Sequence, residues 1–477
     1  MAGTTETGQA EISHLDQRNR RNRSIRDAVS TSLFSKASTA ILQFASLPIA
    51  ARILGREEFG IYATVSTAIF AVAMLQLGVG PALAKGISEA FSKGDQSREA
   101  SYYRNGAILL VALIFAGLSV VMLLLEFVPI AVLFGETYAP WEAEMKSALT
   151  CGALLMAGQL IVAHTDRVRE GYMEAASVNF SSAIGSLIGA GAVAIGVFYF
   201  PSVPFLLAAT YLPQILARLA NTGLLLRKRP YLISRAGRLN RFMMRDLVRD
   251  GLSFSATSFL VFAVEFGLCA LLVGRWLGPA DVAVFHVLMA LNTAFTGLLN
   301  MVGTPIWAAI IDAKDRVDIE WTRETIRRYR LYMIAIAGSA GVGLVTLGPL
   351  LLPIWYGGEF IADRLVFTTF ALFLFVAGWR RIHRTLAIGF GQISSTVAPI
   401  TGGLALGVIL AIVGLTALGL PGVFLGLATG AFLLPGLILP RLIRQSIITL
   451  EDLESESQSV ETRIVPKSRK PQTAGSA

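Results

Sequence analysis

Hydrophobic residues in this sequence gather in runs of about 15–25 residues that recur along nearly its whole length, separated by short polar segments. Runs of about 20 residues can cross a hydrocarbon layer of roughly 30 Å as α-helices, in which the backbone groups are hydrogen-bonded to one another. A transmembrane β-barrel would show short alternating segments instead. The pattern predicts an all-α integral membrane protein with twelve transmembrane helices. We expect these at residues 28–51, 60–84, 105–125, 147–163, 178–199, 205–226, 251–274, 282–304, 331–353, 365–379, 393–415 and 422–440.

The Lys and Arg residues between the runs are distributed unevenly from loop to loop. If the N-terminus is cytoplasmic, the inner loops hold 23 of these residues and the outer loops hold 5. An excess of positive charge in short loops marks the cytoplasmic side. This bias predicts that both termini are cytoplasmic and favours an even number of helices.

An internal repeat divides the chain into halves. Residues 51–62 (ARILGREEFGIY) align with residues 274–285 (GRWLGPADVAVF) at an offset of 223, so that Arg52 matches Arg275 and Gly55 matches Gly278. Six predicted helices separate the copies, which gives both halves the same orientation. We interpret each Arg-x-Leu-Gly as a helix end with a glycine cap and an interfacial arginine. A direct role of these residues in transport is the alternative.

The predicted organisation follows from the runs and the repeat. It comprises a disordered cytoplasmic tail (1–27), an N-terminal six-helix lobe (28–226), a basic cytoplasmic linker (227–250), a C-terminal six-helix lobe (251–440) and a cytoplasmic tail (441–477). Polar, Ser-rich and charged composition predicts that the C-terminal tail is irregular.

Composition agrees with a membrane protein and limits the classes of partner. Hydrophobic residues make up 54% of the chain and charged residues 15%, against about 25% charged in soluble domains. The net charge of +9 lies in segments between apolar runs, which favours anionic lipid headgroups over nucleic acid. Cys151 and Cys269 fall inside apolar runs and resemble small buried residues rather than a disulfide pair. No metal site and no cofactor are expected.

Three ionisable residues fall inside the predicted spans: Lys36, Arg218 and Glu265. Each costs about 2.5–3.5 kcal/mol at a helix centre, so a function or a partner is needed to retain it. At 1.5 Å per residue, Lys36 and Arg218 lie roughly 12 Å from the inner boundary and Glu265 roughly 21 Å along its helix. We predict that the two cations bind an anionic headgroup such as a pyrophosphate.

Glu265 is the candidate site for a coupling proton or sodium ion, or a partner for a cation when substrate is absent. The alternative for Lys36 and Arg218 is that they extend to the inner interface without binding substrate. His164 and His286 lie at span ends and are weaker candidates, because a histidine there more often serves packing.

Residues 47–88 carry a resemblance to a known family. The pattern LG-x-x-x-FG-x-Y begins at Leu54, and LG-x-G-x-A closes the second run before a short charged loop. This stretch resembles the first two helices of the polysaccharide transporter family, which includes the Wzx-type O-antigen and exopolysaccharide repeat-unit flippases. That family belongs to the superfamily of the MATE multidrug exporters and the lipid II flippases.

The resemblance implies two pseudo-symmetric lobes around a central cavity and transport by alternating access. The implied substrate is a polyprenyl-pyrophosphate-linked oligosaccharide, moved across the bacterial inner membrane for lipopolysaccharide or exopolysaccharide biosynthesis. Implied partners are membrane lipids, a coupling proton or sodium ion, and a polysaccharide polymerase and glycosyltransferases. No catalytic residues are implied.

Three alternatives remain open. An ion-coupled multidrug or small-molecule exporter of the same fold would favour an anion-rich cavity in the N-terminal half, whereas Lys36 and Arg218 are both cations. A membrane enzyme would need carboxylates or arginines gathered on a substantial loop, and the predicted outer loops are short. A structural scaffold would not need the internal repeat.

Overall fold

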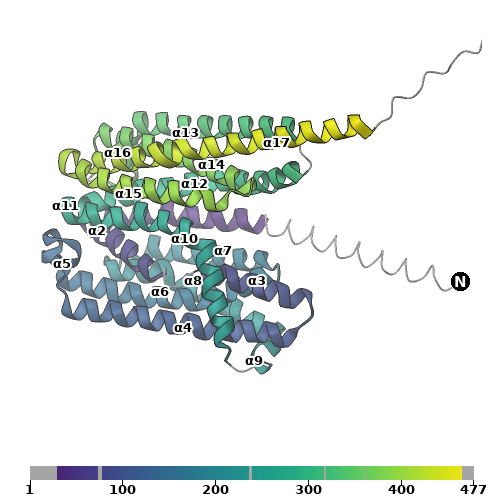
Figure 1. The fold of residues 1–477 in the computed structure, drawn as a ribbon. Helices are drawn as coiled ribbons and strands as arrows, with labels where there is room; N and C mark the ends of the chain where they lie inside the picture. The colour runs from purple at the N-terminus through teal and green to yellow at the C-terminus, as the bar shows by residue number, and fades with distance from the viewer. Residues whose placement is uncertain (1–29, 74–77, 236–238, 316–317, 359, 465–477) are drawn as a thin grey trace, which may run out of the picture. The chain divides into compact units, whose positions relative to one another are not determined.

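A computed structural model describes residues 30–73, 78–235, 239–315, 318–358 and 360–464, and the regular elements within these ranges are helices (Figure 1). They include α2 (Leu47–Ala73), α3 (Val79–Ser92), α4 (Gln96–Phe127), α5 (Ile130–Phe134), α6 (Glu142–Gly171), α7 (Ala175–Gly196), α8 (Val203–Lys228), α9 (Tyr231–Ser234), α10 (Arg241–Phe262), α11 (Cys269–Leu277), α12 (Pro279–Asp315), α13 (Ile319–Tyr356), α14 (Arg364–Gly389), α15 (Ile393–Leu418), α16 (Leu420–Ala431) and α17 (Leu437–Ile464). The helical segments and their apolar composition confirm the predicted all-α membrane fold.

Eleven helical segments of the described chain are long and apolar enough to span a membrane. The first of them, Ser30–Ile69, has 40 residues, twice the roughly 20 that a bilayer requires. Gly55 interrupts it with φ 82° and ψ 174°, so the helix before this glycine and the helix after it are separate. With this break, the eleven segments are consistent with the twelve predicted helices.

Gly278 stands at the equivalent helix end in the second half of the chain. It separates α11 from α12 with φ 94° and ψ 178°, close to the angles of Gly55. This region of backbone space is open essentially to glycine alone. The repeat therefore encodes the same turn twice, which confirms that both Arg-x-Leu-Gly motifs mark helix ends.

The described chain forms two compact units that differ from the predicted lobes in their boundaries. The first unit comprises Met1–Ala290, Leu347–Arg364 and Leu415–Leu420, and the second comprises Leu291–Thr346, Leu365–Gly414 and Pro421–Ala477. In the first unit, α6 packs against α2, α3, α4 and α8, and α8 packs against α7. Two six-helix lobes around a central cavity stay a prediction.

Both predicted tails extend beyond what the structure describes. Residues 1–27 lie outside the described residues. At the other end, α17 continues to Ile464, past the predicted span end at 440 and into the segment expected to be irregular. Its sequence after Arg444 contains no Gly or Pro before Pro466, so nothing interrupts the helix.

Glu174 fixes the loop between α6 and α7 in the first unit. Its carboxylate accepts hydrogen bonds from Arg169 at 2.7 Å, Lys228 at 2.7 Å and Arg229 at 3.0 Å, and the side chain is 19% exposed. Burial raises the pKa of this carboxyl, but the hydrogen bond from Lys228 and the charge of Arg229 outweigh it, so the pKa lies below its ordinary value. The ionised form of Glu174 therefore stabilises the loop.

The first residues of the predicted linker are attached to the same unit. The hydroxyls of Tyr231 and Tyr172 each donate to the Glu99 carboxylate at 2.6 Å. The guanidinium of Arg229 lies 3.7 Å from the centre of the Tyr172 ring. Part of the basic segment 227–250 is thus held by protein contacts, and contact of the remainder with lipid headgroups stays a prediction.

Replacing Gly278 by alanine tests the glycine-dependent turn. The atoms nearest to an added methyl are 3.6 Å away, so backbone strain of about 1–3 kcal/mol, rather than a clash, is expected to lower the thermal unfolding temperature in detergent. Gly297→Ala on α12 is the matched control, because open space surrounds that helical glycine. Equal unfolding temperatures for the two variants would contradict the assigned turn.

Replacing Glu174 by glutamine is expected to cost about 1.5–3 kcal/mol at pH 7, the range for hydrogen bonds to charged groups. Because the folded pKa is lowered, the contribution is present above the ordinary carboxyl pKa and is lost as pH falls through the folded value. The difference in unfolding temperature from wild type should therefore shrink in acid. Glu170→Gln is the control, since Glu170 makes a surface pair with Arg167, and a Glu174 variant indistinguishable from it would refute the anchor.

Candidate functional site

Glu265 lies in the first unit on a π-helical turn, Ala263–Leu268, between α10 and α11. It is 5% exposed. Such turns are rare and are frequent at functional sites. The first half of the chain has a π-helical turn at Leu42–Ser46, which the offset of 223 carries onto 265–269. The repeat therefore includes this irregular turn, with a carboxylate in one copy and Leu42 in the other.

Arg218 on α8 forms an ion pair with Asp166 on α6. Its Nε lies 3.3 Å from Asp166 Oδ2, and its Nη1 donates to Gln159 Oε1 at 2.7 Å. The side chains of Arg218 and Asp166 are 21% and 8% exposed. Asp166 lies outside the fourth predicted span, which ends at residue 163, whereas α6 continues to Gly171. The absence of Gly and Pro between 159 and 170 is the signal that could have found it.

The ion pair leaves hydrogen-bonding capacity unused. Asp166 Oδ1 and Arg218 Nε are both buried and have no hydrogen-bond partner among the residues that the structure describes. One turn further along α8, Thr222 donates to Thr165 at 3.1 Å. A buried charged pair with orphan atoms is costly unless another group completes it. The site therefore has a free acceptor and a free donor side by side.

Lys36 is exposed on the helical residues 30–41. This helix packs against α7, where Thr39 and Ser186 hydroxyls lie 3.4 Å apart. Within the described ranges, no hydrogen bond or ion pair joins Lys36 to Arg218 or to any other side chain. The structure does not bring the two cations into contact, and their joint binding of an anion stays a prediction.

The two candidate histidines differ in their partners. His164 is 7% exposed and its Nε2 lies 3.0 Å from the carbonyl of Tyr103, as expected of a packing residue. His286 has a buried Nδ1 without a hydrogen-bond partner in the described part of the chain. No group of three or more His, Cys, Asp or Glu side chains in the described part of the chain is placed to hold a metal ion.

The repeat turn at Gly55 is joined to the end of α13. Arg52 Nε donates to the carbonyl of Trp355 at 3.1 Å, and its Nη2 bonds to the carbonyl of Ile354. Gly357, with φ 115°, lies against Arg52, so that a side-chain carbon there would approach Arg52 Cγ to 3.2 Å. We name this contact the Arg52 clamp.

The repeat turn at Gly278 makes the corresponding contact with α5, which lies next to α11 (Figure 1). Arg275 Nη1 donates to the carbonyl of Val132 at 3.2 Å. Gly135, with φ 114°, lies so close that an added carbon would be 2.9 Å from Arg275 Cα. This Arg275 clamp and the Arg52 clamp use the same types of residue at an offset of 222–223. Both belong to the first unit.

Contacts between the two repeat turns complete this end of the unit. Arg56 donates to the carbonyl of Ala280 at 2.9 Å and lies 3.3 Å from the Asp281 carboxylate. An aromatic cluster adjoins the Arg52 clamp, with ring centres 5.5–6.4 Å apart. Its members are Phe59, Tyr62, Phe266, His286, Tyr356 and Phe360. Phe59 and Phe360 are each 1% exposed, so these two rings are buried.

Solved structures of membrane transporters have a similar fold. One is a multidrug resistance MATE family transporter of the MOP superfamily, which is 16% identical in sequence to this chain. The superposition on its inward-facing form has a TM-score of 0.69 and covers 88% of this chain and 96% of the transporter. Its outward-facing form gives 0.60, with 90% and 96% covered. A MOP superfamily transporter from Pyrococcus furiosus, described with a binding pocket of reverse polarity, is 15% identical, with a TM-score of 0.59 and 89% and 96% covered.

A comparison with curated protein sequences finds no match. The family model described as "Polysaccharide biosynthesis protein" matches residues 25–310, more than half of the chain. These residues contain both repeat turns and the charged residues Lys36, Asp166, Arg218 and Glu265. The chain therefore has the fold of the solved MOP superfamily transporters, and it belongs to the polysaccharide biosynthesis protein family.

Proposed function

We propose that this protein flips a polyprenyl-pyrophosphate-linked oligosaccharide repeat unit across the bacterial inner membrane by alternating access. The observation that carries the proposal is the match of the polysaccharide biosynthesis family model to a chain with a transporter fold. A saccharide built on a lipid carrier in the cytoplasm has to cross the membrane, and its polar head cannot do so unaided. No bond is made or broken in this function, so no catalytic residue is assigned.

Arg218 is the proposed contact for the pyrophosphate. Its guanidinium carries an unused donor next to the Asp166 carboxylate. A pyrophosphate offers several acceptor oxygens, which suit the planar array of guanidinium donors better than one misaligned carboxylate does. Substrate binding would then exchange one anion for another at Arg218, with the exposed Lys36 as the second proposed contact.

Glu265 is the proposed coupling site for a proton or sodium ion. Its burial on a π-helical turn gives a carboxylate that water reaches poorly, so that binding of a cation changes the local charge strongly. In a π-helical turn the backbone carbonyls do not form the hydrogen bonds of a regular α-helix, so they can contact a ligand. A carboxylate with such carbonyls is a suitable ligand set for a small cation.

The two clamps suit the closing step of alternating access. With the N-terminus in the cytoplasm, both repeat turns lie on the outer side of the membrane. The Arg52 and Arg275 clamps and the aromatic cluster then close that side. Opening toward the outside requires these contacts to break. Because both clamps are built in the same way, the Arg52 and Arg275 contacts can break in the same step.

A multidrug exporter of the same fold is the second candidate. Two observations favour it: multidrug resistance transporters share the fold, and the N-terminal half contains the buried carboxylate Asp166. A carboxylate in that half suits organic cations. Against it, Arg218 neutralises Asp166, and the family match is to polysaccharide biosynthesis.

A deletion strain separates the two functions. Loss of surface polysaccharide with accumulation of cytoplasm-facing lipid-linked repeat unit is expected, and wild type should restore both. Glu265→Gln and a Lys36→Ala, Arg218→Gln, Asp166→Asn variant should be present in the membrane and fail to complement. Asp166→Asn is included because removing Arg218 alone leaves an unpaired buried carboxylate.

Lys93→Ala with Arg227→Ala is the control for this experiment, because it removes two exposed cations from predicted cytoplasmic segments. It should complement fully. Normal export by the triple variant would refute the cationic site while leaving the flippase function in place. Normal surface polysaccharide together with new sensitivity to cationic dyes would instead identify the exporter.

The clamps generate a separate prediction. Arg52→Ala with Arg275→Ala is expected to increase labelling of a Tyr62→Cys reporter by a membrane-impermeant maleimide applied from outside, in a background with Cys151 and Cys269 replaced by serine. Loss of three charged hydrogen bonds shifts the population of the opened state by about tenfold or more. Lys146→Ala, which breaks a surface pair with Glu142, is the control. Unchanged labelling would exclude the clamps as a closing device.

A further inference from the structure

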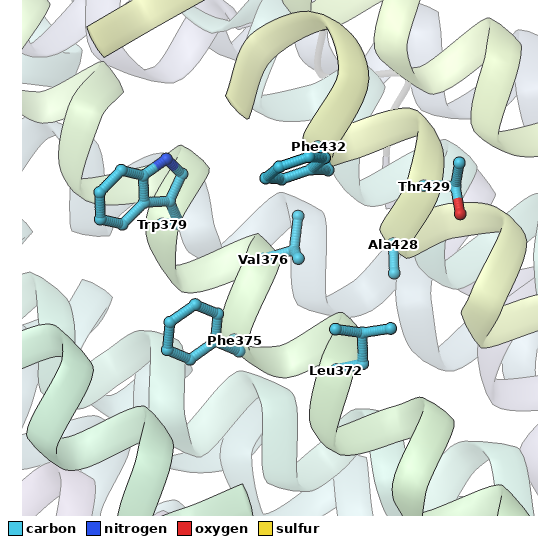
Figure 2. A pocket seen from close by; sticks show the side chains of 7 residues that line it. All are labelled: Leu372, Phe375, Val376, Trp379, Ala428, Thr429 and Phe432. Carbon is cyan, nitrogen blue, oxygen red and sulfur yellow. The ribbon is translucent and has the colours of Figure 1, made fainter. Parts of the chain in front are cut away.

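An apolar groove of about 410 Å³ lies in the second unit between α14 and the end of α16. Leu372, Phe375, Val376 and Trp379 line it from α14, and Ala428, Thr429 and Phe432 line it from the other side (Figure 2). Leu372 is 46% exposed and Phe432 is 47% exposed. The groove therefore opens to the surroundings of the helices, and its lining suits a hydrocarbon chain.

Trp379 forms the end of this groove and is held in place by two contacts. Its indole N–H donates to the carbonyl of Gly436 at 3.0 Å, in the π-helical turn Phe432–Gly436 that follows α16. Its ring centre lies 4.1 Å from that of His383, one turn further along α14. The apolar lining thus gives way directly to polar side chains on the same helix face.

Arg330 of α13 stands at this polar end. Its guanidinium lies 5.9 Å from the centre of the Trp379 ring, and its Nε donates to His383 Nε2 at 3.1 Å. His383 Nδ1 lies 2.8 Å from the carbonyl of Trp379. A carbonyl can only accept, so Nδ1 carries the proton, and Nε2 is the acceptor for Arg330.

The charge of Arg330 is therefore not balanced at this place. His383, fully buried, is a neutral partner in this hydrogen-bond arrangement. None of the carboxylates in the described ranges forms an ion pair with Arg330. The two terminal nitrogens of the guanidinium remain as donors, in the fork geometry that binds phosphate oxygens.

We propose that the groove binds the isoprenoid chain of a lipid-linked pyrophosphate next to its head, with the pyrophosphate on Arg330. This inference rests on the proposed flippase function and adds a subsite to it. The α14 lining from Leu372 to Trp379 is roughly 10 Å long at 1.5 Å per residue, so it accommodates only the first part of a polyprenyl chain. An apolar chain and an anion joined end to end match an apolar groove whose terminal tryptophan lies beside a cation.

A second groove provides an internal comparison. It lies on α4, is lined by Ala107, Ile108, Val111, Ala112, Phe115 and Ala116, and measures about 610 Å³. It is larger and equally apolar, but its lining contains no tryptophan. This groove is suited to acyl chains of ordinary lipids and should not select an isoprenyl pyrophosphate.

Photocrosslinking tests the proposal with the full chain in phosphatidylcholine vesicles. The probe is geranylgeranyl diphosphate with a diazirine on its isoprenoid chain, and crosslinked peptides are identified by mass spectrometry. We expect crosslinks on α14 and α16. Ala428→Trp fills the groove, and Arg330→Gln removes one charged hydrogen-bond donor. Each variant should weaken probe binding by about tenfold or more. Ala112→Trp places the same bulk in the α4 groove and should bind the probe as wild type does.

Competitors separate the possible occupants. Unlabelled geranylgeranyl diphosphate should displace the probe, whereas geranylgeraniol, inorganic pyrophosphate and phosphatidylglycerol should compete at least about tenfold less well. Equal displacement by phosphatidylglycerol would overturn the proposal in favour of a general anionic lipid site. Crosslinks confined to other helices, or equal binding by Ala428→Trp, would also overturn it.

Complementation keeps this inference separate from the proposed function. If Ala428→Trp restores surface polysaccharide as well as Ala112→Trp does, the groove is not a substrate subsite, although the protein remains a flippase. If the deletion strain accumulates no lipid-linked repeat unit, the flippase function fails regardless of probe binding. Loss of complementation by Ala428→Trp and Arg330→Gln, with Ala112→Trp active, is the expected outcome.

Discussion

A hydrocarbon layer offers no water to satisfy polar groups, and this constraint determines most of what is unusual in the molecule. Along its spans the chain satisfies the backbone with helices. Polar side chains inside the spans pair with one another, as Arg218 does with Asp166 and Gln159. Wherever that pairing is incomplete, an unsatisfied buried polar group lowers the stability of the fold, and packing alone does not explain why the group is there. Such places therefore indicate function.

The same constraint explains why glycine and arginine recur together at one end of the helices. A helix that ends leaves carbonyl groups without intrahelical donors. Arg52 and Arg275 supply donors to the carbonyls at the ends of α13 and α5, and Gly357 and Gly135 let the backbones approach closely enough. Because the repeat encodes both clamps, the same arrangement occurs twice. On the proposed function, the same hydrogen bonds cap a helix and close the outer side.

Much of the fold was open to prediction because apolar runs and glycine turns are local signals. The sequence predicts Gly55 and Gly278 as helix ends. It also singles out Glu265 as a candidate site residue, because this carboxylate is isolated in an apolar run. For Asp166 the uninterrupted run from 159 to 170 indicates only that α6 continues, because its burial and its pairing depend on which helix faces it. The π-helical turns and the groove beside Trp379 depend likewise on packing between distant segments. Periodicity carries no information about either.

The two arginines differ in a way that bears on transport. Arg218 already has a carboxylate partner, so on the proposed function an incoming pyrophosphate has to displace Asp166, and the gain is the difference between two anions. Arg330 faces a neutral histidine, so an anion there displaces only weakly bound solvent or lipid. A ligand can shift an equilibrium between conformations only through its differential affinity for them. On the proposed function, Arg330 is therefore suited to bind the lipid-linked head without exchanging a partner, whereas binding at Arg218 changes the pairing of a buried carboxylate.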